Sequence, residues 1–383
     1  MKSSVVSFSA FTISAICAFS PLVSLAQSTP AATSTAPVKV GDVRVIGSQT
    51  VPNDLMVDNT LVGGLSGIDY NAADNSFFII SDDRSDQQPA RFYKAEIPVS
   101  EDAIGAVKID RAVTLLQANG EPYPNVEAGG NVPDPESIRI DPHSGNLFYT
   151  SEGSQKLLID PFMAVAGTDG QYIAGPKTPD IFHMSADKLT GPRDNLVFEG
   201  LSFSVDGSSL WLAMEGPLYQ DGPTATADHG ATSRISNVDR AGNLLGQFAY
   251  ELDPIPGPTG AGYFGTGVTE ILAIDDTRFL TIERASVQGD DGVFRNFIKV
   301  YEIDTAGATD IKSQQWLTPG GYTPVSKRLV LDLNATDVTP IDNVEGITWG
   351  PKLENGNASL ILVSDNNFSD TQVTQFIALE VAS

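Results

Sequence analysis

The sequence is poor in the side chains that support several common chemistries. Its 383 residues include one cysteine, Cys17, and three histidines. Because Cys17 falls in a segment that we expect to be removed, thiol nucleophiles, disulfides and cysteine-ligated metals are excluded from the mature protein. There is no Gly-x-Ser-x-Gly elbow, no Walker loop and no Gly-x-Gly-x-x-Gly motif on a strand-helix unit. A Ser/His/Asp hydrolase and a nucleotide-binding enzyme are therefore disfavoured.

Positive charge is also scarce. The chain has 23 Lys and Arg residues against 48 Asp and Glu residues, which gives a formal net charge of −25. Such a chain repels phosphate backbones and anionic lipid, so we expect neither nucleic acid nor a membrane surface as a partner. Because 41% of the residues are apolar, the bulk of the chain can form a folded core. An acidic chain suits divalent cations wherever its carboxylates converge.

Long apolar runs are confined to the N-terminus. Lys2, the apolar stretch from Val5 to Leu25 and the small-x-small sequence Ser24-Leu25-Ala26 are typical of a signal peptide over residues 1–26. Residues 27–38 are expected to be a flexible leader, and residues 39–383 a single domain. The sequence thus predicts a periplasmic or secreted monomer with no stable membrane insertion; an uncleaved N-terminal anchor is the alternative.

One pattern recurs five times in the expected domain: a polar or acidic residue, an apolar strand, a turn, a second apolar strand and another acid. The copies start at Ser66, Glu136, Glu199, Glu270 and Glu345, with spacings of 70, 63, 71 and 75 residues. The turns carry hairpin sequences such as Asp-Gly and Asn-Gly, and sustained helical periodicity is nearly absent. These features predict an all-β chain.

Further strands are expected between these hairpins. The candidates are Arg91 to Ile97, Val107 to Leu116, Ser233 to Val238, Leu244 to Leu252, Phe297 to Ile303 and Lys327 to Leu333. Two such strands added to each hairpin make a four-stranded blade, which predicts a β-propeller of five or six blades. Val40 to Ile46 would pair with Val373 to Val381, so that the N- and C-terminal strands close the ring and leave no free sheet edge. A solenoid is the rival architecture.

The two ends of a hairpin lie side by side, so the repeated acids are expected to converge at one mouth of the channel. Acids stand at four of the five strand starts and at all five strand ends. They are Glu136, Glu199, Glu270 and Glu345 at the starts and Asp82, Glu152, Glu215, Glu283 and Asp365 at the ends. Carboxylates crowded in this way need cations, and oxygen ligands favour Ca²⁺, with Mg²⁺ or Mn²⁺ as alternatives. The plainer interpretation is that each acid caps exposed backbone or is solvated at a blade rim.

Two arginines stand beside the repeated acids. Arg84 lies two residues after Asp82, and Arg284 directly follows Glu283. Their guanidinium groups could bind a phosphate or carboxylate with two hydrogen bonds, or they could form internal ion pairs that hold the acids in place.

The chain resembles the phytase-like family of exported bacterial proteins, also described as esterase-like activity of phytase. The residues that carry the resemblance are Gly64-Leu65-Ser66-Gly67-Ile68, Ile80-Ser81-Asp82-Asp83-Arg84, Phe198-Glu199-Gly200-Leu201-Ser202-Phe203, Leu210-Trp211-Leu212-Ala213-Met214-Glu215-Gly216, Thr281-Ile282-Glu283-Arg284 and Asn343-Val344-Glu345-Gly346-Ile347. The likeness runs from about Gly63 to Val381. It implies a β-propeller and a link to Ca²⁺-dependent phytases.

The expected function is a metal-dependent hydrolase of small anionic esters, with phosphoesters favoured. The expected metal ligands are Asp82, Glu136, Glu152, Glu215, Glu270, Glu283 and Asp365. Glu199 and Glu345 are the candidate bases, and Arg84 and Arg284 are expected to stabilise developing negative charge. Two alternatives stay open. The segment from Glu345 to Trp349 is also similar to strands of Ca²⁺-dependent lactonase propellers, which would make the chain a lactonase or carboxylesterase. The other alternative is a non-catalytic binding or scaffold propeller.

Overall fold

The computed structural model describes Met1 and residues 39–257 and 262–382. The predicted signal peptide after Met1 and the leader over residues 27–38 therefore lie outside the described residues. In the part of the chain that is described, no helix has the length and apolar character needed to span a membrane.

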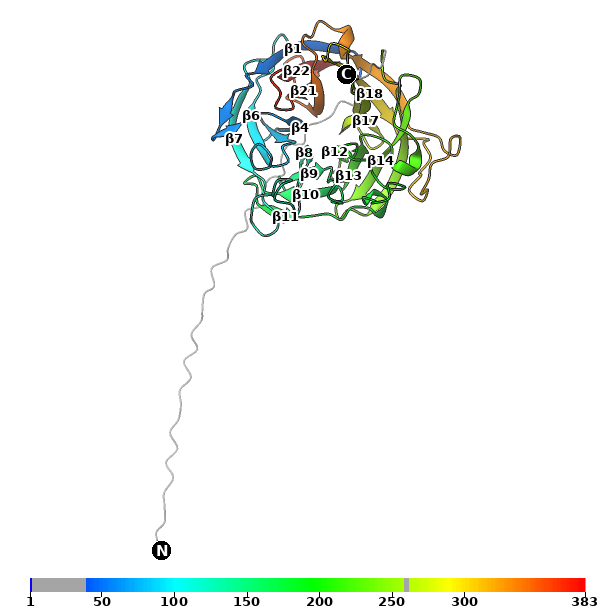
Figure 1. Ribbon diagram of the computed structural model, residues 1–383. Coiled ribbons are helices and arrows are strands. Elements are labelled where there is room, and N and C mark those ends of the chain that lie inside the picture. The colour runs from blue at the N-terminus through cyan, green and yellow to red at the C-terminus, as the bar shows by residue number, and fades with distance from the viewer. Residues whose placement is uncertain (2–38, 258–261, 383) are drawn as a thin grey trace. The chain divides into compact units, whose positions relative to one another are not determined.

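The domain is a ring of five four-stranded antiparallel sheets, which confirms the propeller and sets the blade number at five (Figure 1). In blades 1 to 4 the chain passes from the innermost strand to the outermost. Blade 1 contains β4 (Leu65–Asn71), β5 (Ser76–Ser81), β6 (Arg91–Glu96) and β7 (Lys108–Thr114). Blade 2 contains β8 (Pro135–Ile140), β9 (Leu147–Ser151), β10 (Phe162–Ala166) and β11 (Tyr172–Ala174). Blade 3 contains β12 (Phe198–Phe203), β13 (Ser209–Met214), β14 (Ala231–Asp239) and β15 (Leu244–Leu252). Blade 4 contains β16 (Phe264–Ala273), β17 (Arg278–Gln288), β18 (Phe294–Asp304) and β19 (Ser326–Asp332).

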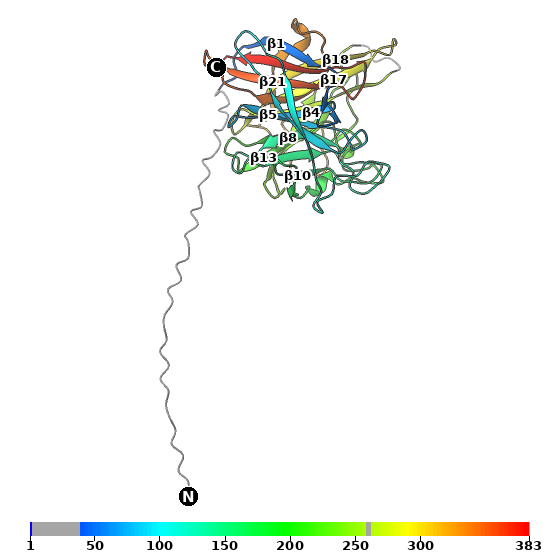
Figure 2. The same cartoon turned by 90° about the vertical axis from the view of Figure 1, so that its left-hand side faces the viewer.

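Blade 5 joins the two ends of the domain. Its strands are β20 (Asn343–Trp349), β21 (Ala358–Asp365), β22 (Thr374–Val381) and, on the outside, β1 (Val43–Val51). β1 runs antiparallel to β22 from the Val43–Val381 pair to the Val51–Thr374 pair, beside the C-terminal strands (Figure 2). The predicted closure is thus confirmed, although β1 starts three residues later and is longer than expected.

The sequence patterns did not predict β10 and β11. β10 reads FMAVA, in which methionine and alanine dilute the β-branched signal, and β11 has only three residues. Short elements also lie outside the blades: the β2–β3 hairpin (Met56–Val57 and Thr60–Leu61) and the 3₁₀ turns η1 (Asp180–Phe182), η2 (Tyr219–Asp221) and η3 (Leu333–Ala335).

Apolar side chains fill the spaces between neighbouring blades. Phe148 of blade 2, for example, packs edge-on against Phe203 of blade 3 with ring centroids 5.1 Å apart. A similar buried cluster joins blades 4 and 5, where Ile282 and Leu362 belong to the same core. Because each sheet buries both faces against its neighbours, the innermost strands are held close to the ring axis.

Arg139, on β8, lies where the inner strands meet and donates hydrogen bonds to their backbone. Its guanidinium reaches the carbonyl oxygens of Ile68 at 2.5 Å, Ile271 at 3.2 Å and Ile347 at 3.1 Å. These acceptors belong to β4, β16 and β20. An innermost strand has an unpaired edge, and the several donors of one arginine satisfy carbonyls on three such edges at once.

Glu270, on β16, is the ion-pair partner of Arg139 at 2.8 Å, and both side chains are buried. Its carboxylate accepts hydrogen bonds from the Leu201 N–H of β12 at 2.8 Å and the Ser137 hydroxyl of β8 at 2.7 Å. Together the two residues therefore contact the inner strands of all five blades. We call this ion pair the axial pair.

Replacing Arg139 with methionine should destabilise the fold strongly. The Arg139→Met variant leaves a buried carboxylate without its counter-charge, and we expect the free energy of unfolding to fall by about 3–5 kcal/mol. Denaturant titration followed by intrinsic fluorescence measures this change. Arg295→Met breaks the exposed ion pair with Asp291 and is the control, with an expected loss below about 1 kcal/mol. Equal losses in the two variants would contradict a special role for the axial pair.

Candidate metal and substrate site

A β-bulge near the start of each inner strand decides which side chains face the mouth of the ring. In β12 the pairing with β13 skips Glu199, and in β20 the pairing with β21 skips Glu345. In β8 the irregularity includes Glu136, and in β4 it falls at Ser66. Glu136, Glu199 and Glu345 all line one cavity. An extra residue re-aims a side chain, so the bulge explains why the acids at these positions face the cavity.

In blade 4, the repeat predicted from the sequence is shifted by one residue relative to the structure. Its bulge falls on Thr269, between the paired residues Val268 and Glu270. Glu270 is thus one position further along than Glu136, Glu199 and Glu345. Because a slip of one residue moves a side chain to the other face of a strand, Glu270 enters the axial pair and does not line the cavity.

The same slip affects the end of the blade 4 hairpin. Glu283 pairs with Val268, and the position that follows this pair, which is acidic in the other four blades, is occupied by Arg284. Glu283 lies elsewhere, where it accepts hydrogen bonds from the Tyr250 hydroxyl at 2.6 Å and the Lys327 ammonium at 2.5 Å. Blade 4 therefore contributes a cation to the cavity where the sequence pattern had suggested two acids.

The cavity has a volume of about 530 Å³ and is lined by acids from four blades. The lining carboxylates are Asp82 from blade 1, Asp134 and Glu136 from blade 2, Glu199 and Glu215 from blade 3, and Glu345 and Asp365 from blade 5. Glu152 lies directly beside them. The structure thus brings together five of the seven predicted ligands and all four predicted catalytic residues. The sequence analysis did not predict Asp134. It lies two residues before Glu136, and side chains two residues apart in an extended chain point to the same side.

Two groups of carboxylates are close enough to share cations. Oxygen atoms of Asp134, Glu136 and Glu152 lie within 4.8 Å of one another, and so do those of Glu152, Glu199 and Glu215. Among the described residues, Oε2 of Glu152 and Oε2 of Glu199 are buried and find no hydrogen-bond partner. Buried, unpartnered carboxylate oxygens in an all-oxygen donor set fit a hard divalent cation. We call these groups the two carboxylate triads, with Glu152 common to both.

Burial raises the pKa of these acids. The pKa of Asp365 rises to about 8, with Glu345 adding repulsion, and that of Asp134 rises to about 7 although Arg84 opposes the shift. Burial also raises the pKa of Glu215 to about 7 against the pull of Arg284. Carboxyls in this environment hold their protons near neutral pH unless a cation replaces them.

Both arginines form ion pairs inside the site. Arg84 contacts Asp134 at 2.5 Å, and its side chain is 38% exposed. Arg284 contacts Glu215 at 2.8 Å and Glu345 at 3.6 Å, with only 13% of its side chain exposed. Internal pairing, one of the two expected roles, is therefore observed, and Arg84 keeps the larger solvent-facing surface.

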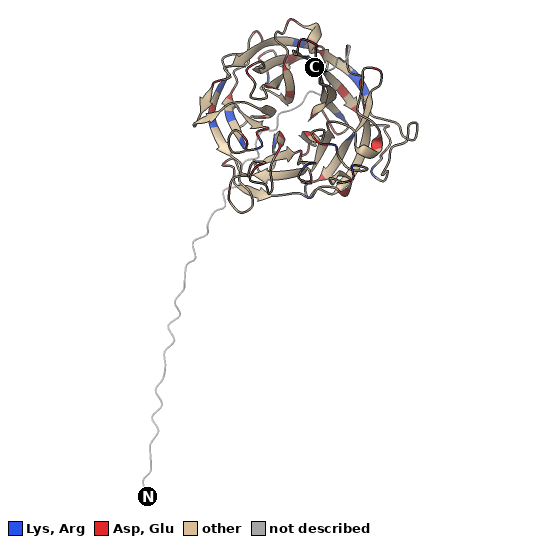
Figure 3. Cartoon of the chain, in the orientation of Figure 1, with Lys and Arg blue, Asp and Glu red and all other residues tan. Residues whose placement is uncertain are grey.

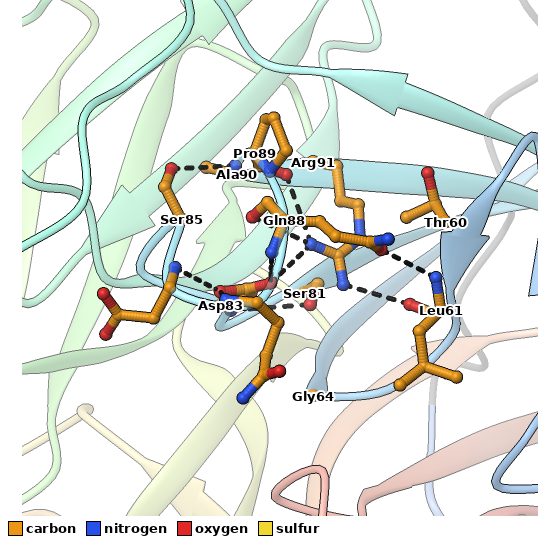
Figure 4. A network of polar contacts seen from close by, with 12 residues as sticks. Thr60, Leu61, Gly64, Ser81, Asp83, Ser85, Gln88, Pro89, Ala90 and Arg91 are labelled. Carbon is orange, nitrogen blue, oxygen red and sulfur yellow. Dashed lines mark hydrogen bonds and ion pairs between the residues drawn. The ribbon is translucent and has the colours of Figure 1, made fainter.

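A buried network holds the loop that carries Asp82 and Arg84 (Figure 4). Asp83, between them, accepts hydrogen bonds from backbone N–H groups of residues 86–88 and pairs with Arg91 at 2.7 Å. Arg91 also donates to the Leu61 carbonyl at 3.1 Å. Asp83 is anchored away from the cavity, whereas its neighbours Asp82 and Arg84 line the cavity.

Glycine permits the close approach of these acids to backbone. Gly64 has φ +62°, and a Cβ there would lie 2.1 Å from Oδ1 of Asp82. At Gly267 a Cβ would lie 2.2 Å from Cγ of Glu215. A larger residue at either position would displace a cavity carboxylate.

The comparisons with known proteins give one family. A family model described as "Phytase-like: Esterase-like activity of phytase" matches residues 60–368. No curated protein matches the sequence. Similar solved structures include the catalytic domain of a Coprinopsis cinerea GH62 α-L-arabinofuranosidase, with 9% identity, a TM-score of 0.39 and coverage of 90% of this chain and 98% of that one. Another is MPT-4, a mannose phosphorylase from Leishmania mexicana, with 11% identity, a TM-score of 0.36 and coverage of 86% and 88%. Likeness at this level supports no functional argument.

The metal-free protein should lose stability as the pH rises. The folded protein retains protons on the cavity acids that the unfolded chain releases near pH 4, so the free energy of unfolding falls between about pH 4 and about pH 8. In EGTA, we expect the thermal midpoint to decrease across this range, and added Ca²⁺ to restore it. Calorimetry at several pH values measures both effects.

The variants for this measurement are a double substitution and a surface control. Glu136→Gln with Glu199→Gln should flatten the pH dependence and weaken the response to Ca²⁺. Asp291→Asn, at an exposed ion pair, should leave both unchanged. A midpoint that stays level in EGTA would contradict the effect of burial, and a midpoint that Ca²⁺ does not raise would contradict a cation site.

Proposed function

We propose that this chain, which belongs to the phytase-like family (esterase-like activity of phytase), is a metal-dependent hydrolase of ester bonds that favours phosphoesters. The observation that carries the proposal is the pair of carboxylate triads, with unpartnered buried oxygens on Glu152 and Glu199, beside two arginines in one cavity. The family supports hydrolase chemistry in general. The metal, the phosphoester and the residue roles below are our proposal.

The two carboxylate triads are the proposed metal site. Ca²⁺ is favoured because it accepts many carboxylate oxygens, whereas Mg²⁺ retains more of its waters. A cation bound there would polarise a substrate oxygen and lower the pKa of a bound water. This assignment adds Asp134 and moves Glu199 from the candidate bases to the metal ligands. It leaves out four of the predicted ligands: Glu270 and Glu283, which do not line the cavity, and Asp82 and Asp365, which line it outside the triads.

Glu345 is the proposed general base. It lines the cavity but lies outside both triads, so a cation there would leave it free to accept a proton. The Asn343 amide donates to its Oε1 at 2.9 Å, and this contact orients the carboxylate. Burial raises the pKa of Glu345, with Arg284 and Asn343 acting in the opposite direction. A raised carboxyl pKa brings the base closer to the pH at which it must work.

Arg84 and Arg284 are proposed to bind the acid part of the ester. Both guanidinium groups line the cavity, on the sides of blades 1 and 4. Fixed positive charge in a buried site stabilises negative charge that develops on the substrate oxygens, and it needs no reorganisation during the reaction. The ion pairs with Asp134 and Glu215 hold the two groups in place.

The charge of the site favours a second candidate, the hydrolysis of a carboxyl ester or lactone. Eight carboxylates face two arginines. Two divalent cations would leave a formal charge of about −2, which disfavours substrates with several phosphates. A neutral or singly charged ester meets less repulsion.

Substitution of Glu345 should remove activity without unfolding the protein. We expect Glu345→Gln to lower kcat by about 100-fold or more, the range for loss of a general base. The substrates are p-nitrophenyl phosphate, p-nitrophenyl acetate and a lactone, each with Ca²⁺ and with EGTA. Glu283→Gln, an acid of the same sequence repeat that lies outside the cavity, is the matched control and should keep full activity. Hydrolysis of none of the three substrates would leave a binding or scaffold propeller in place of an enzyme.

We also propose that the chain is exported after cleavage behind Ala26, because residues 1–26 have the features of a signal peptide. Intact-mass analysis of the expressed protein should find Gln27 at its N-terminus. A mass that retains residues 1–26 in a membrane fraction would support the uncleaved anchor and sink this assignment.

A further inference from the structure

Two aromatic side chains, Tyr263 and Phe294, stand at the edge of the acidic cavity. Both line the cavity, yet 55% of Tyr263 and 44% of Phe294 remain exposed. Their ring centroids are 6.0 Å apart, with an angle of 52° between the planes. We call this pair the aromatic lip. Two exposed rings next to a polar cavity offer a flat apolar surface that water solvates poorly.

Phe294 is the first residue of β18, in an unusually long hairpin of blade 4, and Tyr263 lies directly before β16 of the same blade. β17 and β18 have 11 residues each, whereas β5 and β6 of blade 1 have 6 each. The additional pairs include Gln288 with Phe294, the last pair of the β17–β18 ladder. The extension therefore places Phe294 beside the mouth, in the blade that also supplies Arg284.

Tyr263 is directed toward the site by the glycine next to β16's first residue. A Cβ on Gly265 would lie 2.8 Å from the Tyr263 hydroxyl, so the ring folds over this glycine. Although more than half of Tyr263 is exposed, burial around its hydroxyl raises the pKa and Arg284 lowers it, so the hydroxyl end lies within electrostatic reach of the cavity. The ring thus has one end near the reacting groups and a face open to solvent.

The remaining lining groups show what kind of ligand the lip suits. In the described part of the chain, the cavity's cations are Arg84 and Arg284, and each is already paired with a carboxylate. The other polar groups are neutral: Asn195, Ser286, Asn296, Asn343, Asn367 and Gln372. A second anionic group on the substrate would find no free positive charge there.

We propose that Tyr263 and Phe294 bind the non-reacting part of the substrate and that this part is a neutral group with a flat apolar face, such as an aromatic ring. The proposal rests on the proposed function, because it assumes that the acid part of an ester occupies the metal and arginine groups. It makes the lip a specificity determinant that takes no part in bond cleavage.

The test compares anions that differ only in the ring and cannot be hydrolysed. Calorimetric titration of the full mature chain with Ca²⁺ uses phenylphosphonate against methylphosphonate, and benzoate against acetate. In at least one pair the ring compound should bind about fivefold more tightly or better, the gain that an aromatic contact provides. The double variant Tyr263→Ala, Phe294→Ala should abolish this preference, and Tyr263→Phe should keep it. Trp316→Ala removes another exposed aromatic, on the connection that leaves the far end of β18, and should change nothing.

Each outcome decides for or against the lip. Equal affinities within both pairs, binding of none of the four anions, or a preference that survives in a double variant with a normal melting midpoint would overturn it. Failure of the proposed function gives a different result. A chain that hydrolyses no ester but prefers the ring compounds, and loses this preference in the double variant, keeps the lip and loses the catalytic assignment.

Discussion

The ion pair between Arg139 and Glu270 is the contact on which the arrangement of the blades most depends. A propeller leaves five inner strand edges with unpaired carbonyl and N–H groups around its axis. Arg139 supplies donors for the carbonyls, and Glu270 supplies acceptors for an N–H group and a hydroxyl. A single apolar side chain could not satisfy groups of both kinds, so a buried pair of opposite charges is suited to this place. The bulges that aim the cavity acids lie on the same inner strands, close by along the chain.

The site differs from the fivefold pattern of the fold in blade 4, and this difference gives the cavity its chemical polarity. Four blades contribute carboxylates, although the whole domain carries acids on every blade (Figure 3). Blade 4 contributes Arg284 and the aromatic lip, with Phe294 at the start of β18 and Tyr263 directly before β16. The cavity thus has the donor set for a cation and, directly beside it, groups that suit an anion and an apolar ring. An ester has all of these partners in one molecule.

Much of this architecture could be predicted from the sequence. The five hairpins, their spacing and the pairing of the chain ends follow from alternating apolar residues and turn sequences, which are local signals. Most of the cavity acids could be found too, because Glu136, Glu199 and Glu345 recur at the same place in similar strands. β10 and β11 could not be predicted, because the alanines and methionine of β10 carry little β-signal and β11 has only three residues. β10 forms through pairing with β9, and β11 through pairing with β10.

The sequence by itself determined an acidic all-β repeat that contains no cysteine, closed by pairing of its own ends, with carboxylates at one mouth. The tertiary structure decided which of these acids meet. Glu270 and Glu283 match the repeat in the sequence, but the bulge at Thr269 shifts blade 4 by one residue. This shift directs Glu270 toward the axis and places Arg284 in the cavity. A bulge is a difference in pairing between two strands, so periodicity along one strand does not reveal it. Burial, which raises the pKa of the remaining acids, likewise exists only once the five blades have closed around them.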